Sequence, residues 1–160
     1  MLKVGLGFDV HRFTRGRDLI IGGVKIPNEE GLLGYSDADV LIHAIMDALL
    51  GSFSEKDIGQ HFPNTDKEFE DISSIDLLTR VGKMLQKAGR KTVNIDSVII
   101  MESPKISPYS DEMRENIANA LGISKDDISI KATTSEGLGY VGRGEGAACY
   151  AVAMTDSVDR

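Results

Sequence analysis

An aspartate and a histidine stand two residues apart near the start of the chain. Asp9 and His11 follow a short glycine-containing apolar run, which predicts a strand over residues 3–9. Because residues i and i+2 of an extended segment point to the same side, the carboxylate and the imidazole would face one point at the end of that strand. These groups are suitable ligands for one divalent metal ion. The alternative is a polar pair on the surface, and this triplet alone leaves both interpretations open.

Another histidine lies in a segment that is apolar on nearly every side, residues 37–50. Such a helix is buried, and Asp39, His43 and Asp47 form one polar stripe along it with a period of four residues. Buried polar groups need partners. His43 could be hydrogen-bonded between the two carboxylates, or it could bind a metal while a neighbouring acid orients its other ring nitrogen.

Together, Asp9, His11 and His43 would supply three protein ligands to one ion. A fourth position would then stay open for water or substrate, which is typical of a catalytic rather than a structural zinc site. The remaining histidine, His61, lies in a polar segment and is interpreted as an ordinary loop residue.

A second group of polar residues closes a predicted strand over residues 128–134. Thr133, Thr134 and Ser135 offer hydroxyls and backbone amides, which suit phosphate oxygens. Glu136 could hold a hard cation such as Mg²⁺ or Mn²⁺ against those phosphates. Threonines at the end of a strand are also ordinary strand formers, which is the alternative.

The glycine-rich run over residues 137–146 begins with a match to G-x-G-x-x-G. A dinucleotide site is rejected, because a strand rather than a helix is expected next and no ribose-binding acid can be placed about 20 residues on. A tight crossing of backbone segments is expected instead, with Arg143 and Glu145 as an ion pair.

Periodicity and turn signals predict the elements that would position these residues. Ser36 is expected to cap the helix that stops at Gly51. The polar segment 52–71 is expected to be a long loop, functional or mobile. Two short strands are predicted over residues 19–27, helices over 72–88 and from Ser107 or Ser110 to near Gly122, and strands over 93–101, 128–134 and 147–154. This order indicates an α+β or α/β fold, one domain over residues 1–160 with a single sheet covered by helices.

Composition limits the class of protein. The chain has 160 residues, 41% of them hydrophobic, and a formal net charge of −7 at pH 7. The acidic balance argues against nucleic acid or an anionic membrane as partner, and no apolar run reaches the roughly 20 residues of a membrane span. The single cysteine excludes an internal disulfide, and with no export signal at the start we expect a cytoplasmic protein. The sequence contains no P-loop and no recognised serine or cysteine nucleophile motif.

Six ordered blocks resemble the 2-C-methyl-D-erythritol 2,4-cyclodiphosphate synthase family. They are GFDVH (7–11), IGGV (21–24), SDADVLIHA (36–44), DIG with FPNTD (57–59 and 62–66), KATT (131–134) and GRGEG (142–146). The blocks span essentially the whole chain. Their order and spacing make the match specific, which no single block would be.

The resemblance implies an α+β homotrimer with active sites between adjacent subunits. It also implies a cytidine diphosphate substrate, 4-diphosphocytidyl-2-C-methyl-D-erythritol 2-phosphate, whose 2-phosphate attacks the β-phosphorus of its own diphosphate. The products are 2-C-methyl-D-erythritol 2,4-cyclodiphosphate and CMP, in the non-mevalonate route to isoprenoids. Such a reaction needs positioning and charge neutralisation rather than a nucleophilic side chain.

The resemblance further implies residue roles. Asp9, His11 and His43 would bind Zn²⁺, and Glu136 would bind Mg²⁺ or Mn²⁺ beside the catalytic Thr134. A central cavity near Tyr140, Arg143 and Glu145 would accept isoprenoid diphosphates. The implied substrate contacts are Ser36, Asp57, Ile58, Gly59, Phe62, Pro63, Asn64, Thr65 and Asp66; Met101, Glu102, Ser103, Pro104, Lys105, Ile106 and Ser107 for the nucleotide; and Thr133, Thr134, Ser135 and Glu136 for the phosphates.

One residue departs from the family pattern: Tyr35 stands where histidine is common before the Ser-Asp pair. Tyrosine keeps a hydroxyl donor but carries no positive charge near pH 7, so we expect Tyr35 to donate a hydrogen bond to a phosphate oxygen as a catalytic residue. Two other functions stay open at this point. One is a zinc-dependent phosphohydrolase, and the other is a non-enzymatic trimeric module that binds a metabolite.

Overall fold

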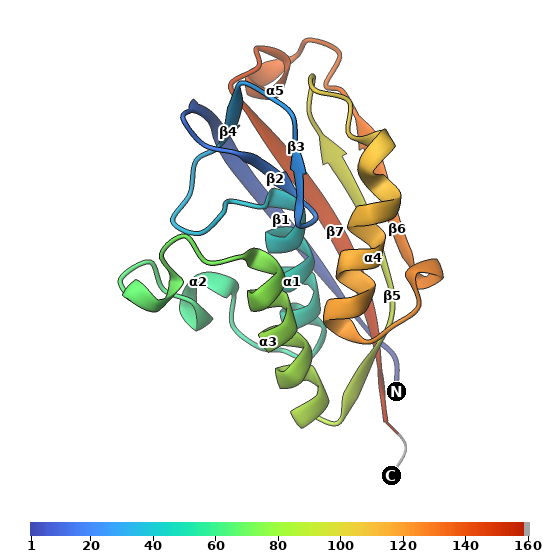
Figure 1. Cartoon of the computed structure of the whole chain (residues 1–160). Helices are drawn as coiled ribbons and strands as arrows, with labels where there is room; N and C mark the ends of the chain where they lie inside the picture. Colours follow the sequence, from blue (N-terminus) through green and yellow to red (C-terminus); the bar gives the residue numbers. More distant parts are fainter. Residues whose placement is uncertain (159–160) are drawn as a thin grey trace.

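A five-stranded mixed sheet forms the centre of the molecule (Figure 1). The computed structural model describes residues 1–158 of the chain. The strand order is β4-β1-β7-β5-β6, and every neighbouring pair is antiparallel except β5 with β6. The strands are β1 (Lys3–Arg15), β4 (Glu30–Leu32), β5 (Arg90–Ile100), β6 (Ile128–Thr133) and β7 (Gly146–Ser157); β2 (Leu19–Ile21) and β3 (Val24–Ile26) form a separate hairpin.

Three long helices lie on one face of this sheet (Figure 1): α1 (Val40–Ser52), α3 (Ser74–Lys87) and α4 (Ser110–Leu121). Helix α4 connects β5 to β6, because parallel neighbours require a crossover. The shorter helical elements are α2 (Ile58–His61), α5 (Gly139–Gly142) and 3-10 turns at Lys67–Phe69, Ser107–Tyr109 and Lys125–Asp127. The core lies between the long helices and the sheet, and α1 is buried on nearly every side, as predicted. Over residues 1–158, no helix has the length and apolar character needed to cross a membrane.

Helix α1 packs closely on β1 and β7 because the strand residues beneath it are small. Gly5 and Gly7 face the helix from β1. A Cβ atom on Gly7 would lie 1.9 Å from the carbonyl oxygen of Ala44, which is far inside van der Waals contact. The inward residues of β7 include the buried Ala151 and Ala153. This close approach brings the side chains of α1 within reach of those on β1.

Over β1 and β7, the opposite face of the sheet is apolar and exposed. The outward side chains of β1 and β7 are Val4, Leu6, Phe8, Val10, Tyr150 and Val152, with exposed fractions between 41% and 67%. The rings of Phe8 and Tyr150 pack together across the two strands with centroids 4.7 Å apart. A contiguous apolar face of this kind indicates a surface for association.

Strand β1 is longer than the sequence predicts. It continues past Asp9 to Arg15, because residues 3–12 pair with β7 and residues 13–15 pair with β4. His11 therefore lies inside a paired strand rather than beyond its end. Pairing with β7, which is far away in the sequence, stabilises an extension that local periodicity did not indicate.

Helix α1 also differs from its prediction at both ends. Asp39, not Ser36, is the N-cap, since its carboxylate accepts a hydrogen bond from the N–H of Ile42. Gly51 lies inside the helix, which continues to Ser52. The segment 52–71 is not a continuous loop, because it contains α2 and a 3-10 turn, and β4 was not predicted. The other predicted elements are present, and the architecture is α+β. The predicted single sheet is wrong, because β2 and β3 pair only with each other and form a second, two-stranded sheet.

Candidate metal centre and ligand pocket

Three side chains from β1 and α1 converge at one point. Asp9 and His11 occupy alternate positions of β1 on the face toward α1, and His43 lies one turn into α1. The Oδ2 atom of Asp9 lies 2.8 Å from Nε2 of His11 and 3.0 Å from Nδ1 of His43. The two ring nitrogens are 3.1 Å apart. The three groups are therefore placed to share one ion, since their ligand atoms all lie within 4.8 Å of one another.

The outer nitrogen of each imidazole has a partner of its own. Nδ1 of His11 lies 2.7 Å from the carbonyl oxygen of Leu33, and because a carbonyl only accepts, Nδ1 carries the hydrogen. Nε2 of His43 lies 3.1 Å from the hydroxyl of Ser36 and 3.0 Å from the hydroxyl of Ser74. One nitrogen of each ring and one carboxylate oxygen thus face a common centre, an arrangement that fits a divalent cation.

Asp9 and His11 shift each other's pKa. Burial raises the pKa of Asp9, but hydrogen bonds from His11 and His43 together with their charges outweigh burial and lower it to about 2. Burial lowers the pKa of His11, but the hydrogen bond and charge of Asp9 outweigh it, so the net shift is upward from 6.5. The carboxylate is therefore ionised at neutral pH, and protons compete with a metal for the His11 ring.

The stability of the metal-free protein should depend on pH through His11. A group with a raised folded pKa contributes stability that is complete below its unfolded pKa and is lost as the pH rises through the folded pKa. We expect the difference in unfolding free energy between wild type and His11→Gln to be largest below pH 6.5 and to shrink as the pH rises through the raised pKa of His11 in the folded protein. Denaturant titrations of chelator-treated protein measure this difference. A difference that does not change with pH would contradict the pairing of His11 with Asp9.

Asp39 does not orient His43, contrary to both predicted arrangements of the polar stripe. Its carboxylate is fully buried and accepts hydrogen bonds from the N–H groups of Gly22 and Gly23. Burial and the nearby charge of Asp37 raise the pKa of Asp39 to about 6, against the opposing effect of those hydrogen bonds. Asp39 therefore fastens the β2–β3 turn to the start of α1.

Asp47 does not orient His43 either. Its carboxylate accepts a 2.9 Å hydrogen bond from the N–H of Ile58, the first residue of α2. The residues that do contact the outer nitrogen of His43 are Ser36 and Ser74. Ser74 is not among the predicted site residues, because a serine at the start of a helix carries no sequence signal for this contact.

A cavity of about 250 Å³ opens beside the three ligand atoms. Residues 34–36 and the apolar side chains of Met46, Phe69 and Leu77 line it together with Asp9, His11 and His43, the candidate metal-binding cluster. Of the predicted substrate contacts in the segment 57–66, the cavity is lined by Ile58, Gly59, Phe62 and Asn64, while Asp57, Pro63, Thr65 and Asp66 lie in the same segment without lining it. Asp57 instead caps α2.

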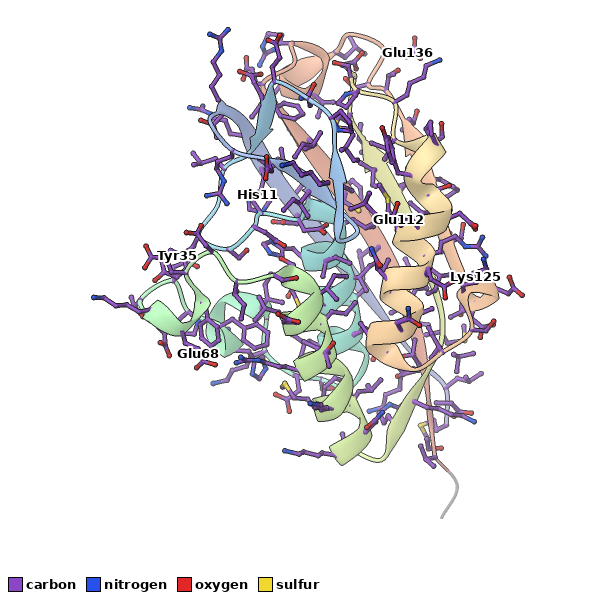
Figure 2. The ribbon with its side chains drawn as sticks, viewed as in Figure 1. His11, Tyr35, Glu68, Glu112, Lys125 and Glu136 are labelled. Carbon is purple, nitrogen blue, oxygen red and sulfur yellow. The ribbon has the colours of Figure 1, made fainter. Side chains whose placement is uncertain are left out.

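Tyr35 connects the cavity to that segment. Its hydroxyl donates a 3.2 Å hydrogen bond to the carbonyl oxygen of Asp66. Its own carbonyl oxygen accepts a 2.9 Å hydrogen bond from the N–H of Asp71. Figure 2 labels Tyr35 beside the segment that contains α2.

The predicted phosphate segment lies at the ends of β5 and β6. The hydroxyl of Thr134 donates to Glu136 at 3.2 Å, and both the hydroxyl and the N–H of Ser135 donate to Glu102. Figure 2 shows Glu136 well away from His11, at the upper end of the molecule in this view. Within one chain, the metal-binding cluster and the phosphate segment therefore do not form a single site.

A second cavity, of about 340 Å³, lies beside the phosphate segment. It is lined by Met101, Glu102, Pro104, Lys105, Ile106, Ser107, Ala132, Thr133 and Thr134. Most of the predicted nucleotide contacts therefore line this one cavity. Ser103 lines a neighbouring polar hollow together with Glu102.

The glycine-rich run forms the predicted tight crossing. A Cβ atom on Gly142 would lie 2.0 Å from the carbonyl carbon of Gly137. Arg143 and Glu145 form the expected ion pair, with Nε and Oε1 2.6 Å apart, and both side chains are exposed. Tyr140 in α5 is also partly exposed.

The chain is similar to proteins of one known family over nearly its whole length. The chain matches the model of the YgbB family over residues 2–156. It is 53% identical over 155 residues to a protein of Chlorobaculum parvum named 2-C-methyl-D-erythritol 2,4-cyclodiphosphate synthase, covering 97% of this chain and 99% of that protein. It is 56% identical over 153 residues to a protein of the same name from Chlorobium phaeobacteroides, covering 96% and 97%.

Solved structures show the same fold. The IspF–CDP complex of Plasmodium falciparum superimposes with a TM-score of 0.87 at 30% identity, covering 99% of this chain and 97% of that one. The bifunctional IspDF of Campylobacter jejuni superimposes with a TM-score of 0.95 at 38% identity. The chain spans 43% of that bifunctional protein.

Proposed function

The chain belongs to the YgbB family of 2-C-methyl-D-erythritol 2,4-cyclodiphosphate synthases, and from that membership we propose that it carries out an intramolecular phosphoryl transfer. The substrate is 4-diphosphocytidyl-2-C-methyl-D-erythritol 2-phosphate. An oxygen of its 2-phosphate forms a bond to the β-phosphorus, and the bond from that phosphorus to the bridging oxygen breaks. CMP leaves with the bridging oxygen, and the product is the 2,4-cyclodiphosphate of isoprenoid biosynthesis.

The structural observation that supports this proposal is the convergence of Asp9, His11 and His43 at the edge of a cavity. Three protein ligands with an open side are typical of a catalytic metal site. Because the substrate brings its own nucleophile, the reaction needs no nucleophilic side chain. Cys149, the one cysteine in the sequence, is buried in the core, where burial raises the pKa of its thiol. The site is thus suited to positioning and charge neutralisation.

We assign Zn²⁺ to Asp9, His11 and His43, and Mg²⁺ or Mn²⁺ to Glu136. A carboxylate with two imidazoles suits zinc, whereas a carboxylate beside hydroxyls suits a hard cation. When bound, the two cations supply charge neutralisation and polarisation to the diphosphate. Thr134, whose hydroxyl already contacts Glu136, is placed to hold a phosphate oxygen beside the second cation as a catalytic residue.

The two cavities divide the substrate between them in this proposal. The cavity beside the metal-binding cluster takes the erythritol part, held by Ser36 and the segment 57–66. The cavity over residues 101–107 takes the cytidine part, and residues 133–136 contact the phosphates. A CDP-bound relative of the same fold supports a cytidine nucleotide as ligand.

We also propose a homotrimer with active sites between adjacent subunits. Glu136 lies well away from His11 in one chain (Figure 2), and the nucleotide cavity is lined by the nearby Thr133 and Thr134, so in this proposal a complete site combines the cluster of one copy with the cavity of another. The exposed apolar face of β1 and β7 offers a surface for that association. Tyr140 and the exposed Arg143 would then lie near a central cavity, where a guanidinium suits an isoprenoid diphosphate.

The assembly is tested by placing a charge on the apolar face. Leu6→Asp should dissociate the assembly and lower CMP release in parallel, because an unpaired carboxylate would be buried in the interface and the sites are shared. Light scattering after size exclusion should give the wild type three times the mass of one chain. Asn119→Asp, which adds the same charge on the exposed side of α4, should keep that mass. A monomeric wild type with full turnover contradicts the proposal.

Tyr35→Phe should lower the turnover number by about 3- to 10-fold, which corresponds to the loss of one hydrogen bond. The hydroxyl holds Asp66 in the structure, and in the proposal it turns to a phosphate oxygen when substrate binds. Steady-state rates of CMP release measure the effect. Unchanged turnover would remove Tyr35 from the catalytic residues.

The function itself is tested by incubating the protein with the cytidyl substrate, Zn²⁺ and Mg²⁺. We expect CMP and a cyclic diphosphate in equal amounts, the latter identified by phosphorus NMR. Inorganic phosphate or a linear monophosphate as product would indicate a phosphohydrolase instead. Binding without any turnover would indicate a metabolite-binding module.

A further inference from the structure

The hydroxyl of Ser74 lies on the far side of the His43 ring from the metal-binding cluster. Ser74 begins α3 and is fully buried, and its Oγ atom is 3.0 Å from Nε2 of His43. Its hydroxyl and its N–H both contact the carboxylate of Asp37, the N–H at 2.9 Å. A continuous path of hydrogen bonds therefore runs from Asp37 through Ser74 to the ring.

We propose that Ser74 and Asp37 are positioning residues that set the orientation and the tautomer of His43, so that its Nδ1 lone pair faces a metal ion. This inference rests on the proposed metal-binding role of the cluster. The pair does not touch substrate or metal, and it acts only through the imidazole.

The direction of each hydrogen bond follows from the chemistry of the groups. An ionised carboxylate only accepts, so the hydroxyl proton of Ser74 goes to Asp37. The oxygen of Ser74 then has only lone pairs left for His43, and it must accept the Nε2 hydrogen. A ring that carries its hydrogen on Nε2 presents a bare Nδ1 to Asp9 and His11. A carboxylate, a hydroxyl and a histidine thus form the kind of outer contact that orients metal-binding imidazoles.

Ser36 contacts the same nitrogen but has a different place in this network. Its oxygen lies 3.1 Å from Nε2 of His43 and accepts a hydrogen bond from the N–H of Ala38. Among the described residues, no carboxylate accepts a hydrogen bond from the hydroxyl of Ser36. Since Ser36 also lines the cavity, its proton is free to turn toward a ligand while Ser74 holds the ring.

Asp37 is itself held in place. Its N–H donates to the carbonyl oxygen of Ile72, and its Oδ1 accepts from the N–H of Asp39, the cap of α1. The carboxylate therefore fastens the entry of α1 to the entry of α3. The position of α3 therefore affects the orientation of the His43 ring through Ser74.

The experiment compares Ser74→Ala with Ser73→Ala, an exposed neighbour that makes no side-chain capping bond at the same helix end. Zinc affinity is measured by competition with a chelator, and nitrogen NMR reports the tautomer of His43 in metal-free protein at a pH where the ring is neutral. We expect the Nε2–H tautomer in the wild type. Ser74→Ala should weaken zinc binding by about 10- to 100-fold and raise the share of the other tautomer. Ser73→Ala should match the wild type in both.

Asp37→Asn is the second variant, because it keeps the side-chain size and removes the charged acceptor. It should shift the tautomer in the same direction by a smaller amount. A wild-type ring with its hydrogen on Nδ1, or a Ser74→Ala variant that binds zinc as tightly as Ser73→Ala, overturns the inference. A wild type that binds no zinc overturns the proposed metal site instead, so the two failures are distinct.

Discussion

His43→Ala should abolish zinc binding and lower CMP release by about 10³-fold or more, while the chain stays folded. His43 is the one ligand that comes from α1, and without it only Asp9 and His11 on a single strand are left. Two ligands hold zinc poorly, and charge stabilisation by a bound cation amounts to several kcal/mol in the transition state. Each 1.4 kcal/mol is a factor of ten in rate, which gives the expected magnitude.

The matched control is His61→Ala. His61 lies in α2, and its nearest charged partner is Glu55 at 3.4 Å rather than the cluster. The control should retain stoichiometric zinc, measured by atomic absorption after dialysis. Circular dichroism of both variants checks that they are folded. If His43→Ala kept both its zinc and its turnover, the metal site would have to be sought elsewhere.

Gly7→Ala should destabilise the protein by about 3 kcal/mol or more, or prevent folding. The added methyl group would lie 1.9 Å from the carbonyl oxygen of Ala44 and 2.8 Å from the backbone nitrogen of Ala48, both in α1. Backbone atoms of a packed strand and helix have no rotamer to change, so α1 would have to move away from β1. That movement would also separate His43 from Asp9, so any folded fraction should bind zinc weakly.

Gly51→Ala is the control for this prediction. Gly51 lies in the same helix, and a Cβ atom there would be 3.9 Å from the Cα atom of Gly5, an ordinary contact. This exchange should stabilise the protein by about 0.5–1 kcal/mol, because alanine loses less backbone entropy than glycine in a helix. Urea denaturation of both variants measures the difference. Equal stability of Gly7→Ala and wild type would contradict the close packing of α1 on β1.

Much of the candidate metal site could be predicted from local sequence patterns. The alternation of a strand was enough to place Asp9 and His11 on one side, and the apolar surroundings of His43 predicted a buried helix. The meeting of these two elements is confirmed by the geometry of the cluster. The separation of the cluster from Glu136 could not be predicted by the same means, because periodicity describes faces and not distances between them (Figure 2).

The partners of the buried polar groups were mostly mispredicted. The stripe of acids along α1 suggested that a carboxylate would orient His43, yet Asp39 binds the turn at Gly22 and Gly23. Ser74, thirty-one positions further along the chain, takes the place at the ring. Spacing along one helix shows which side chains share a face, but it contains no information about the segment that covers that face.

By itself, the sequence determined which side chains point the same way, which segments are buried, and the family to which the motifs belong. The tertiary structure alone decided the length of β1, the cap of α1 and the hydroxyl that holds His43. The reason is physical: a buried polar group is satisfied by whichever donor or acceptor packing brings within about 3 Å. In this protein that packing depends on two glycines that allow a helix to lie directly on a strand.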